Sequence, residues 1–312
     1  MHPRIEWPNG KSFAFTIFDD TDYQTATNVA PVYDFLSDIG LQTTKSVWPI
    51  LGKGRTRIGG STCEDPVYRA WVVDLQRRGV EIALHNVTHH TSTRQETAEG
   101  LERFQGLFGH YPHTMANHTG CREGIYWGRA RLSGLHRFVY DLLHLREVRN
   151  EFQGHIEQSP LFWGDLCRDK IRYVRNFTFP ETNTLKACPV MPYHDPCRPF
   201  VNRWFAATDG SGVASFTQML SERHQDQLAA EGGACIMYTH FAQGFAQNGR
   251  LHHRFETLMK RLSNLNGWFV PVHTLLDFLG SSQRARNITT TERAQLERRW
   301  LLHKMFTTKG RT

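Results

Sequence analysis

Short apolar runs alternate along the chain with longer segments whose apolar residues recur at helical spacing. The short runs predict buried strands, and the longer segments predict helices with one polar face. Strands are predicted at Ser12–Phe18, Gln42–Trp48, Val80–Asn86, His113–His118, Ile171–Phe177, Phe200–Ala207, Ala234–Phe241 and Gly267–Val270. Helices are predicted at Ala26–Ile39, Glu64–Arg78, Arg94–Phe108, near 127–135, Phe216–Ala230 and Leu251–Leu265.

The repeated order of strand and then helix predicts an α/β fold with a parallel sheet. In a chain of 312 residues, a closed or nearly closed (β/α) barrel of seven or eight strands fits this rhythm better than an open sheet. Active sites of such barrels lie at the carboxyl ends of the strands. Polar candidates follow the predicted strands at those ends, namely Asp19, Asp20, His85, His118, Asp209 and His240. We therefore expect these side chains to meet in one site.

Composition places the chain among ordinary globular proteins, with 39% hydrophobic and 21% charged residues. The first residues lack the basic segment and apolar core of a secretory signal, so a cytoplasmic location is expected. Six cysteines are scattered without any Cys-x-x-Cys pair. This spacing argues against a zinc ribbon and favours reduced thiols.

Most of the positive charge lies at the end of the chain. Residues 281–312 hold eight Lys or Arg and two Glu, which is six of the seven net positive charges. We therefore expect a barrel over residues 1–280 and a basic amphipathic helix over 281–312, begun by a capping box from Thr289 to Glu292. The helix could touch an anionic surface, or its apolar positions Leu296, Trp300 and Met305 could pack on the barrel or on another copy in a homo-oligomer. Packing is favoured, and no nucleic-acid partner is expected because the rest of the chain is almost neutral.

One carboxylate and two imidazoles form a candidate metal-ligand set, Asp20, His85 and His89. Three protein ligands leave a position open for water, which is the catalytic pattern. His89 follows His85 at helical spacing, and the adjacent Asp19 is free to hold a proton from that water. The same ligand types also form the facial triad of non-haem iron oxygenases, so that class is the competing enzyme.

These motifs resemble those of the polysaccharide deacetylase family, which shares the NodB homology domain. The first motif of the family is a strand ending in Thr-Phe-Asp-Asp, and the chain has Phe18-Asp19-Asp20 with Ile17 between Thr16 and Phe18. The second is His-Ser/Thr-x-x-His, matched by 85–89 apart from an asparagine at position 86. The run 236–240 is similar to the last motif. The motifs arrive in the family's order, and the resemblance spans residues 11 to 279.

The resemblance implies a role for each matched residue. Asp19 would be the general base, and Asp20, His85 and His89 would bind one divalent metal ion. Zn²⁺ is the first choice, with Co²⁺, Ni²⁺, Mn²⁺ or Fe²⁺ as alternatives. His240 would be the general acid, and Asp209 could orient its ring, although an Asp-Gly turn explains Asp209 equally well.

The chain also departs from the family's pattern. Thr21-Asp22 replaces the usual Gly-Pro, and the arginine motif after the fourth strand is missing. Arg122 or Arg175 could supply that arginine, and Asn117 or His118 could orient substrate or bind metal. Trp163, like Trp48 and Trp127, could stack on a sugar ring.

The sequence therefore predicts a metal-dependent hydrolase that removes an acetyl or other acyl group from an N-acylated sugar or a related small amide. A catalytically impaired carbohydrate-binding relative and a hydrolase of another non-peptide C–N bond are the alternatives.

Overall fold

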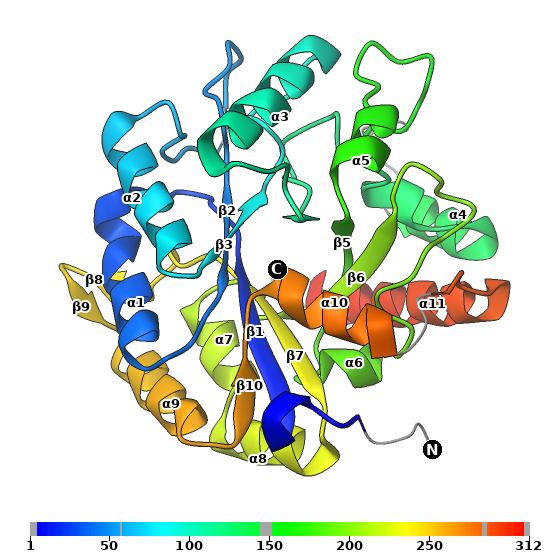
Figure 1. Ribbon diagram of the computed structural model, residues 1–312. Helices are drawn as coiled ribbons and strands as arrows, with labels where there is room; N and C mark the ends of the chain where they lie inside the picture. The colour runs from blue at the N-terminus through cyan, green and yellow to red at the C-terminus, as the bar shows by residue number, and fades with distance from the viewer. Residues whose placement is uncertain (1–4, 57, 144–151, 283–285, 309–312) are drawn as a thin grey trace.

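The computed structural model of the protein describes residues 5–56, 58–143, 152–282 and 286–308 (Figure 1). Eight parallel strands form the main sheet: β1 (Phe13–Asp19), β2 (Thr44–Val47), β3 (Glu81–Leu84), β4 (Thr114–Met115), β5 (Tyr173–Phe179), β6 (Arg203–Asp209), β7 (Ala234–Thr239) and β10 (Gly267–Phe269). A separate hairpin joins β8 (Ala246–Gln247) to β9 (Arg250–Leu251).

The strands β1 to β7 close into a barrel because β1 pairs with β7 along almost its whole length. On its other edge, β1 pairs first with β10 at Phe13–Phe15 and then with β2 at Phe18 and Asp19. The expected α/β barrel is therefore confirmed as a closed seven-strand parallel barrel, with β10 as a short addition beside β1.

Helices surround this barrel (Figure 1). They are α1 (Ala26–Asp38), α2 (Pro66–Arg77), α3 (Arg94–Phe108), α4 (Gly134–Leu143), α5 (Gly164–Lys170), α6 (Thr184–Ala187), α7 (Val213–Met219), α8 (Glu222–Glu231), α9 (His253–Ser263), α10 (Val272–Ser282) and α11 (Thr290–Thr308), with 3-10 turns η1 (Pro8–Gly10) and η2 (Gly128–Arg131). None of the described helices is long and apolar enough to cross a membrane.

Two helical regions differ from the sequence prediction. The helix predicted at Phe216–Ala230 is two helices, because the chain is extended at Ser221 between α7 and α8. The unpredicted α10 begins beside the first residues of β2 and β3. Its first backbone N–H groups donate to Thr44 and to the buried carboxylate of Glu81, so strand side chains satisfy this helix end.

The C-terminal helix α11 packs on the barrel wall. Leu296, Trp300 and Leu301 are buried, and the Trp300 ring stacks on Tyr140 of α4 at 5.9 Å. The predicted capping box is present, with the Glu292 N–H donating to Thr289 Oγ1 and the Thr289 N–H donating to Glu292. Of the two expectations for this segment, packing on the barrel is therefore the one observed.

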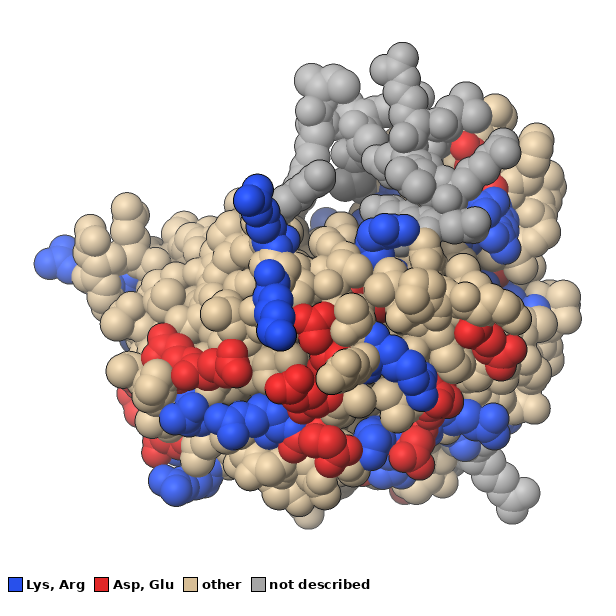
Figure 2. Space-filling view, turned by 90° about the horizontal axis from the view of Figure 1, so that it is seen from above, with Lys and Arg blue, Asp and Glu red and all other residues tan. Residues whose placement is uncertain are grey.

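Acidic side chains neutralise much of the positive charge of α11. Arg293 lies 2.8 Å from Asp195, and Arg299 lies 2.6 Å from Glu181. On the face seen in Figure 2, basic and acidic side chains are interleaved rather than gathered into one basic patch. The net charge of the sequence therefore does not by itself define a docking surface.

Candidate active site

The four residues that end β1 and follow it point alternately to the two sides of the barrel wall. Asp19 contacts Tyr33 of α1 and Thr21 contacts Tyr68 of α2, both outside the barrel. Asp20 contacts Arg175 of β5 and Asp22 contacts His118, both on the inner side. Successive side chains of an extended strand point to opposite faces, and this alternation separates Asp19 from Asp20 where β1 ends; Asp22 lies in the turn that follows.

Asp19 lies in a closed polar network outside the barrel. Its Oδ1 accepts from the Gln24 amide at 2.7 Å and from the Phe241 backbone N–H at 2.8 Å, and its Oδ2 accepts from the Tyr33 hydroxyl at 2.6 Å. The fully buried Lys45 ammonium is 3.9 Å away. Burial raises the pKa of Asp19 and lowers the pKa of Lys45 to about 8. The geometry does not support the expected base role of Asp19, because its contacts fix α1 and the segment after β7.

Asp20 forms a buried bidentate ion pair with Arg175. The two guanidinium nitrogens lie 2.9 and 2.6 Å from the two carboxylate oxygens, and both side chains are 3% exposed. Burial opposes the charge of Arg175, but the Asp20 carboxylate outweighs it and raises the pKa of Arg175. Of the two arginines proposed from the sequence to pair with the site, Arg175 is the one that does so.

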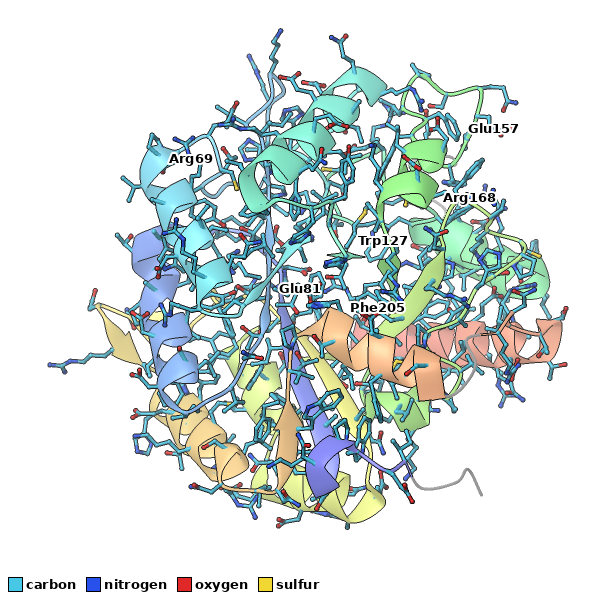
Figure 3. All side chains as sticks on the ribbon, viewed as in Figure 1. Arg69, Glu81, Trp127, Glu157, Arg168 and Phe205 are labelled. Carbon is cyan, nitrogen blue, oxygen red and sulfur yellow. The ribbon has the colours of Figure 1, made fainter. Side chains whose placement is uncertain are left out.

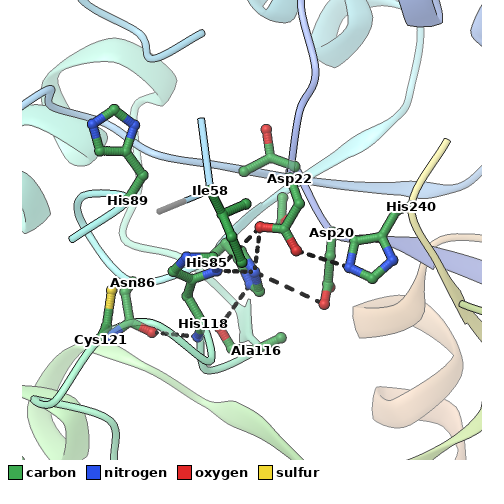
Figure 4. Close-up of polar contacts among 12 residues, drawn as sticks. Asp20, Asp22, Ile58, His85, Asn86, His89, Ala116, His118, Cys121 and His240 are labelled. Carbon is green, nitrogen blue, oxygen red and sulfur yellow. Dashed lines mark hydrogen bonds and ion pairs between the residues drawn. The ribbon is translucent and has the colours of Figure 1, made fainter. Parts of the chain in front are cut away.

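Asp22, His85 and His118 form the metal-ligand group that the structure brings together (Figure 4). Asp22 Oδ1 lies 3.1 Å from His118 Nδ1 and 3.6 Å from His85 Nε2, and the two nitrogens lie 3.1 Å apart. All three side chains are buried. They come from the carboxyl ends of β1, β3 and β4. The strands β3 and β4 are neighbours in the barrel, and β2 lies between β1 and β3.

The donor set fits one divalent metal ion. Ligands about 2.1 Å from a tetrahedral metal lie roughly 3.4 Å from one another, close to the three separations in this group. Asp22 Oδ1 is buried and accepts no hydrogen bond of normal geometry from the described residues, so a metal ion at this place would satisfy it. His85 Nδ1 contacts the Ala116 carbonyl at 3.1 Å, which fixes the proton there and leaves Nε2 free to bind metal.

His240 completes the group from the side of β7. Its Nε2 lies 2.8 Å from Asp22 Oδ2, and its Nδ1 lies 2.8 Å from the Ser211 carbonyl. Burial alone would lower the pKa of His240, but contact with Asp22 outweighs it and raises the pKa to about 9. Burial alone would raise the pKa of Asp22, but contacts with His118, His240 and His85 outweigh it and hold this pKa well below its usual value. Burial lowers the pKa of His118.

The structure does not bring His89 into the metal-ligand group. The predicted helical turn from His85 to His89 is absent, because Asn86 adopts a left-handed backbone with φ of 56° and the following residues form bends. Figure 4 shows the His89 ring directed away from Asp22. His118 occupies the place expected for His89, and Asp22 the place expected for Asp20.

Asp209 does not orient His240, contrary to the expectation. Both ring nitrogens of His240 have other partners, and Asp209 lies 3.5 Å from His303 and 3.8 Å from Lys304 of α11. The carbonyl of Ser211 holds the imidazole in its place. Asp209 therefore connects β6 to α11.

The other substrate-binding candidates lie in different surroundings. Asn117 exchanges two hydrogen bonds with the backbone of Ile125, and the Trp163 ring N–H donates to the Glu123 carbonyl at 2.6 Å. Trp163 is 1% exposed, whereas Arg122 is exposed to solvent. These contacts give Asn117 and Trp163 structural partners, and a part for any of the three in binding stays a prediction.

Asp22 is the functional residue that the sequence prediction missed. The alternation of side chains along β1 separates Asp19 from Phe18 and Asp20, but Asp22 lies in the turn after the strand, so the strand pattern alone does not place it. Asn86 has a positioning role that the sequence did not suggest. Its Oδ1 accepts from the His118 N–H, and its Nδ2 donates to the buried carboxylate of Glu123, so it ties the β3 and β4 loops together.

No protein-family model and no curated protein sequence matches this chain. Solved structures share its fold. A protein described as a polysaccharide deacetylase from Mycobacterium smegmatis matches with a TM-score of 0.51 and 12% identity, over 92% of this chain and 96% of that one. PuuE allantoinase matches with a TM-score of 0.51 and 12% identity, over 90% and 95%. A protein described as a polysaccharide deacetylase from Pseudomonas aeruginosa PAO1 matches with a TM-score of 0.51 and 11% identity, over 89% and 94%.

At these identities the likeness concerns the fold alone. The chain has the NodB-type barrel found in polysaccharide deacetylases and in an allantoinase. The inner side of this barrel holds a buried Asp-His-His group that could bind one metal ion.

Proposed function

We propose that this protein is a metal-dependent hydrolase that cleaves the C–N bond of an N-acylated sugar or a related small amide. The observation that carries the proposal is the group of Asp22, His85 and His118, whose three ligand atoms have the separations of one face of a metal tetrahedron. A bound divalent ion would polarise the acyl carbonyl and lower the pKa of water.

Asp20 is the carboxylate best placed to accept the proton of the attacking water. Its Oδ2 lies 3.9 Å from His85 Nε2, so it borders the metal-ligand group without belonging to it. The bidentate contact with Arg175 fixes the orientation of the carboxylate. In this assignment, the general-base role implied for Asp19 by the family's motif falls to Asp20, and the ligand role implied for Asp20 falls to Asp22.

His240 is the candidate general acid. A ring that donates from Nδ1 to the Ser211 carbonyl and from Nε2 to Asp22 carries two protons. The water oxygen bonds to the acyl carbon, Asp20 takes a water proton, and the C–N bond breaks as His240 gives its Nε2 proton to the leaving nitrogen. The products are a carboxylic acid and an amine.

The likeness to PuuE allantoinase supports a second candidate substrate class. A ureido or cyclic amide C–N bond could be cleaved by the same groups, since the attack of water and protonation of nitrogen are common to both reactions. The fold does not distinguish the two classes, because the deacetylase and allantoinase structures match equally well.

A substrate screen with matched variants tests this proposal. Acyl release from N-acetylated sugars and amine release from ureido compounds would be measured before and after treatment with a chelator. We expect the protein to hydrolyse compounds of one of these two classes. The chelator should abolish this activity, and added Zn²⁺ or Co²⁺ should restore it. His240→Gln should lose activity by roughly 10²-fold or more, whereas His253→Gln, an exposed control on α9, should not. Turnover that survives complete metal removal would contradict the proposal.

A further inference from the structure

Arg131 is a buried arginine with no acceptor among the described residues. Its side chain is 5% exposed, and it makes no hydrogen bond or ion pair to any part of the chain that the structure describes. Burial lowers its pKa to about 9. Arginines in protein interiors are normally paired with carboxylates, because the desolvation of an unpaired guanidinium is costly.

Aromatic rings hold this guanidinium in a defined plane. The Arg131 guanidinium carbon lies 3.1 Å from the centre of the Trp127 ring and 5.0 Å from that of Trp300 on α11. Tryptophan rings contact the face of a guanidinium and not its edge, so they favour the cation without using its N–H groups as donors. In Figure 3, Trp127 lies toward the middle of the molecule, whereas Glu157 and Arg168 lie at its edge.

The backbone that carries Arg131 is also fixed. Arg198 donates to the Ala130 carbonyl at 3.1 Å and to the Arg131 carbonyl, and it pairs with Asp195. Glu297 of α11 accepts from Ser133 and Arg198. Asp195 and Glu297 therefore pair with other groups, and no carboxylate of the described residues forms an ion pair with Arg131.

Arg131 lies within electrostatic reach of the catalytic group. Tyr140, Arg175 and Tyr238 are near enough to affect its pKa electrostatically. Arg175 lies 4.3 Å above the Tyr238 ring, and the Tyr238 hydroxyl lies 3.4 Å from His240 Nε2. The two arginines bring two positive charges to this side of the barrel, and Asp20 neutralises only the one on Arg175. Among the described residues, the charge of Arg131 therefore has no carboxylate partner.

We propose that Arg131, stacked between Trp127 and Trp300, binds a carboxylate or phosphate group of the substrate. This inference rests on the proposed hydrolase function and narrows its substrate to an acylated compound with a negative charge. Two parallel N–H···O bonds from the guanidinium would hold the anionic group in one orientation. This would fix the position of the scissile C–N bond relative to Asp22 and His240. A neutral N-acylated sugar would lack this anchor.

Binding to the full chain tests the inference without requiring turnover. Calorimetric titration would compare N-acetylglucosamine with two charged probes, N-acetylmuramic acid for a carboxylate and N-acetylglucosamine 6-phosphate for a phosphate. We expect the wild type to bind at least one charged probe about 10-fold to 100-fold more tightly than the neutral one. Arg131→Gln should abolish that preference, Arg131→Lys should retain part of it, and the exposed control Arg298→Gln should retain all of it.

The three probes distinguish a carboxylate ligand from a phosphate ligand. They also distinguish failure of the anion-binding proposal from failure of the hydrolase proposal. A preference for one charged probe identifies a carboxylate or a phosphate as the ligand. Equal binding of all three probes by the wild type overturns the inference, even if Arg131→Gln fails to fold. A charge preference that survives in folded Arg131→Gln also overturns it. Charge preference without acyl release in any substrate would contradict the hydrolase alone.

Discussion

Asp19 and Asp22 are both buried carboxylates at the end of one strand, yet their surroundings differ in kind. Asp19 receives hydrogen bonds from Gln24, Tyr33 and the Phe241 backbone, so its bonding capacity is used by the protein itself. Asp22 leaves Oδ1 without a normal hydrogen bond and places it beside two imidazole nitrogens. A satisfied buried charge stabilises a fold, whereas an unsatisfied one indicates a ligand.

The largest expected effect is on the inner side of the wall, at Asp20. Asp20→Asn keeps the shape of the side chain and a contact to Arg175 but cannot accept a proton. Activity should fall by about 10²-fold to 10⁴-fold while metal content stays unchanged. Metal analysis and acyl-release kinetics on the same preparation check both parts. Turnover close to that of the wild type in Asp20→Asn would show that another group is the general base.

On the outer side, Asp19 should matter for stability. Asp19→Ala removes the counter-charge of the buried Lys45 and the acceptor of the Tyr33 hydroxyl and the Phe241 N–H, and we expect a loss of about 3–5 kcal/mol in the free energy of unfolding. Asp22→Ala should cost less in metal-free protein, because its imidazole partners can become neutral. Urea unfolding of the two metal-free variants compares them. Equal losses of unfolding free energy in the two variants would contradict the assignment of Asp19 to stability and Asp22 to metal binding.

The stability of the folded protein should depend on pH through Glu123, which binds the Asn86 side chain next to the metal-ligand group. Burial raises the pKa of Glu123 to about 7, above its value of about 4.5 in the unfolded chain. The folded protein therefore binds the proton more tightly, so the stabilisation is present below pH 4.5 and is lost as the pH rises through 7. Relative to Glu123→Gln, the wild type should lose roughly 2 kcal/mol between pH 5 and pH 7.5. Unfolding curves that keep a constant difference would contradict this pKa.

The smallest effect is expected at His89. This ring lies outside the metal-ligand group, so His89→Ala should keep the metal stoichiometry of the wild type, whereas His118→Ala should lose it. Metal content after extensive dialysis is the measurement. If the two substitutions release metal equally, His89 belongs to the first coordination sphere after all.

The fold could be predicted from the sequence further than the site could. The fold follows from local signals in the sequence. These are the apolar strands, the capping residues such as Thr289 and the polar residues that follow strands, and each lies in the structure where the sequence predicts it. The ligand set depends on backbone geometry that local patterns do not determine. The left-handed backbone at Asn86 turns the chain so that His89 does not join the metal-ligand group. The alternation of side chains along β1 places Asp19 and Asp20 on opposite sides of the barrel wall. His118 was already a candidate because it follows β4, but its partner Asp22 requires the path of the chain beyond the strand.

The partner of Asp20 was uncertain for the same reason. Arg122 is near His118 in sequence, whereas Arg175 is distant in sequence and reaches Asp20 because its side chain extends inward from β5 in the barrel wall. Long-range pairing of this kind follows from the closed sheet and is not visible in a motif.

The most direct test of the account is the position of a bound metal. Crystals grown with Zn²⁺ would be measured at and below the zinc absorption edge, so that anomalous density locates the ion. We predict one strong peak bound by Asp22, His85 and His118 at about 2.0–2.2 Å, with Asp19 remote from it. A peak held by Asp20, His85 and His89, or no peak at this group in metal-replete crystals, would contradict the central claim.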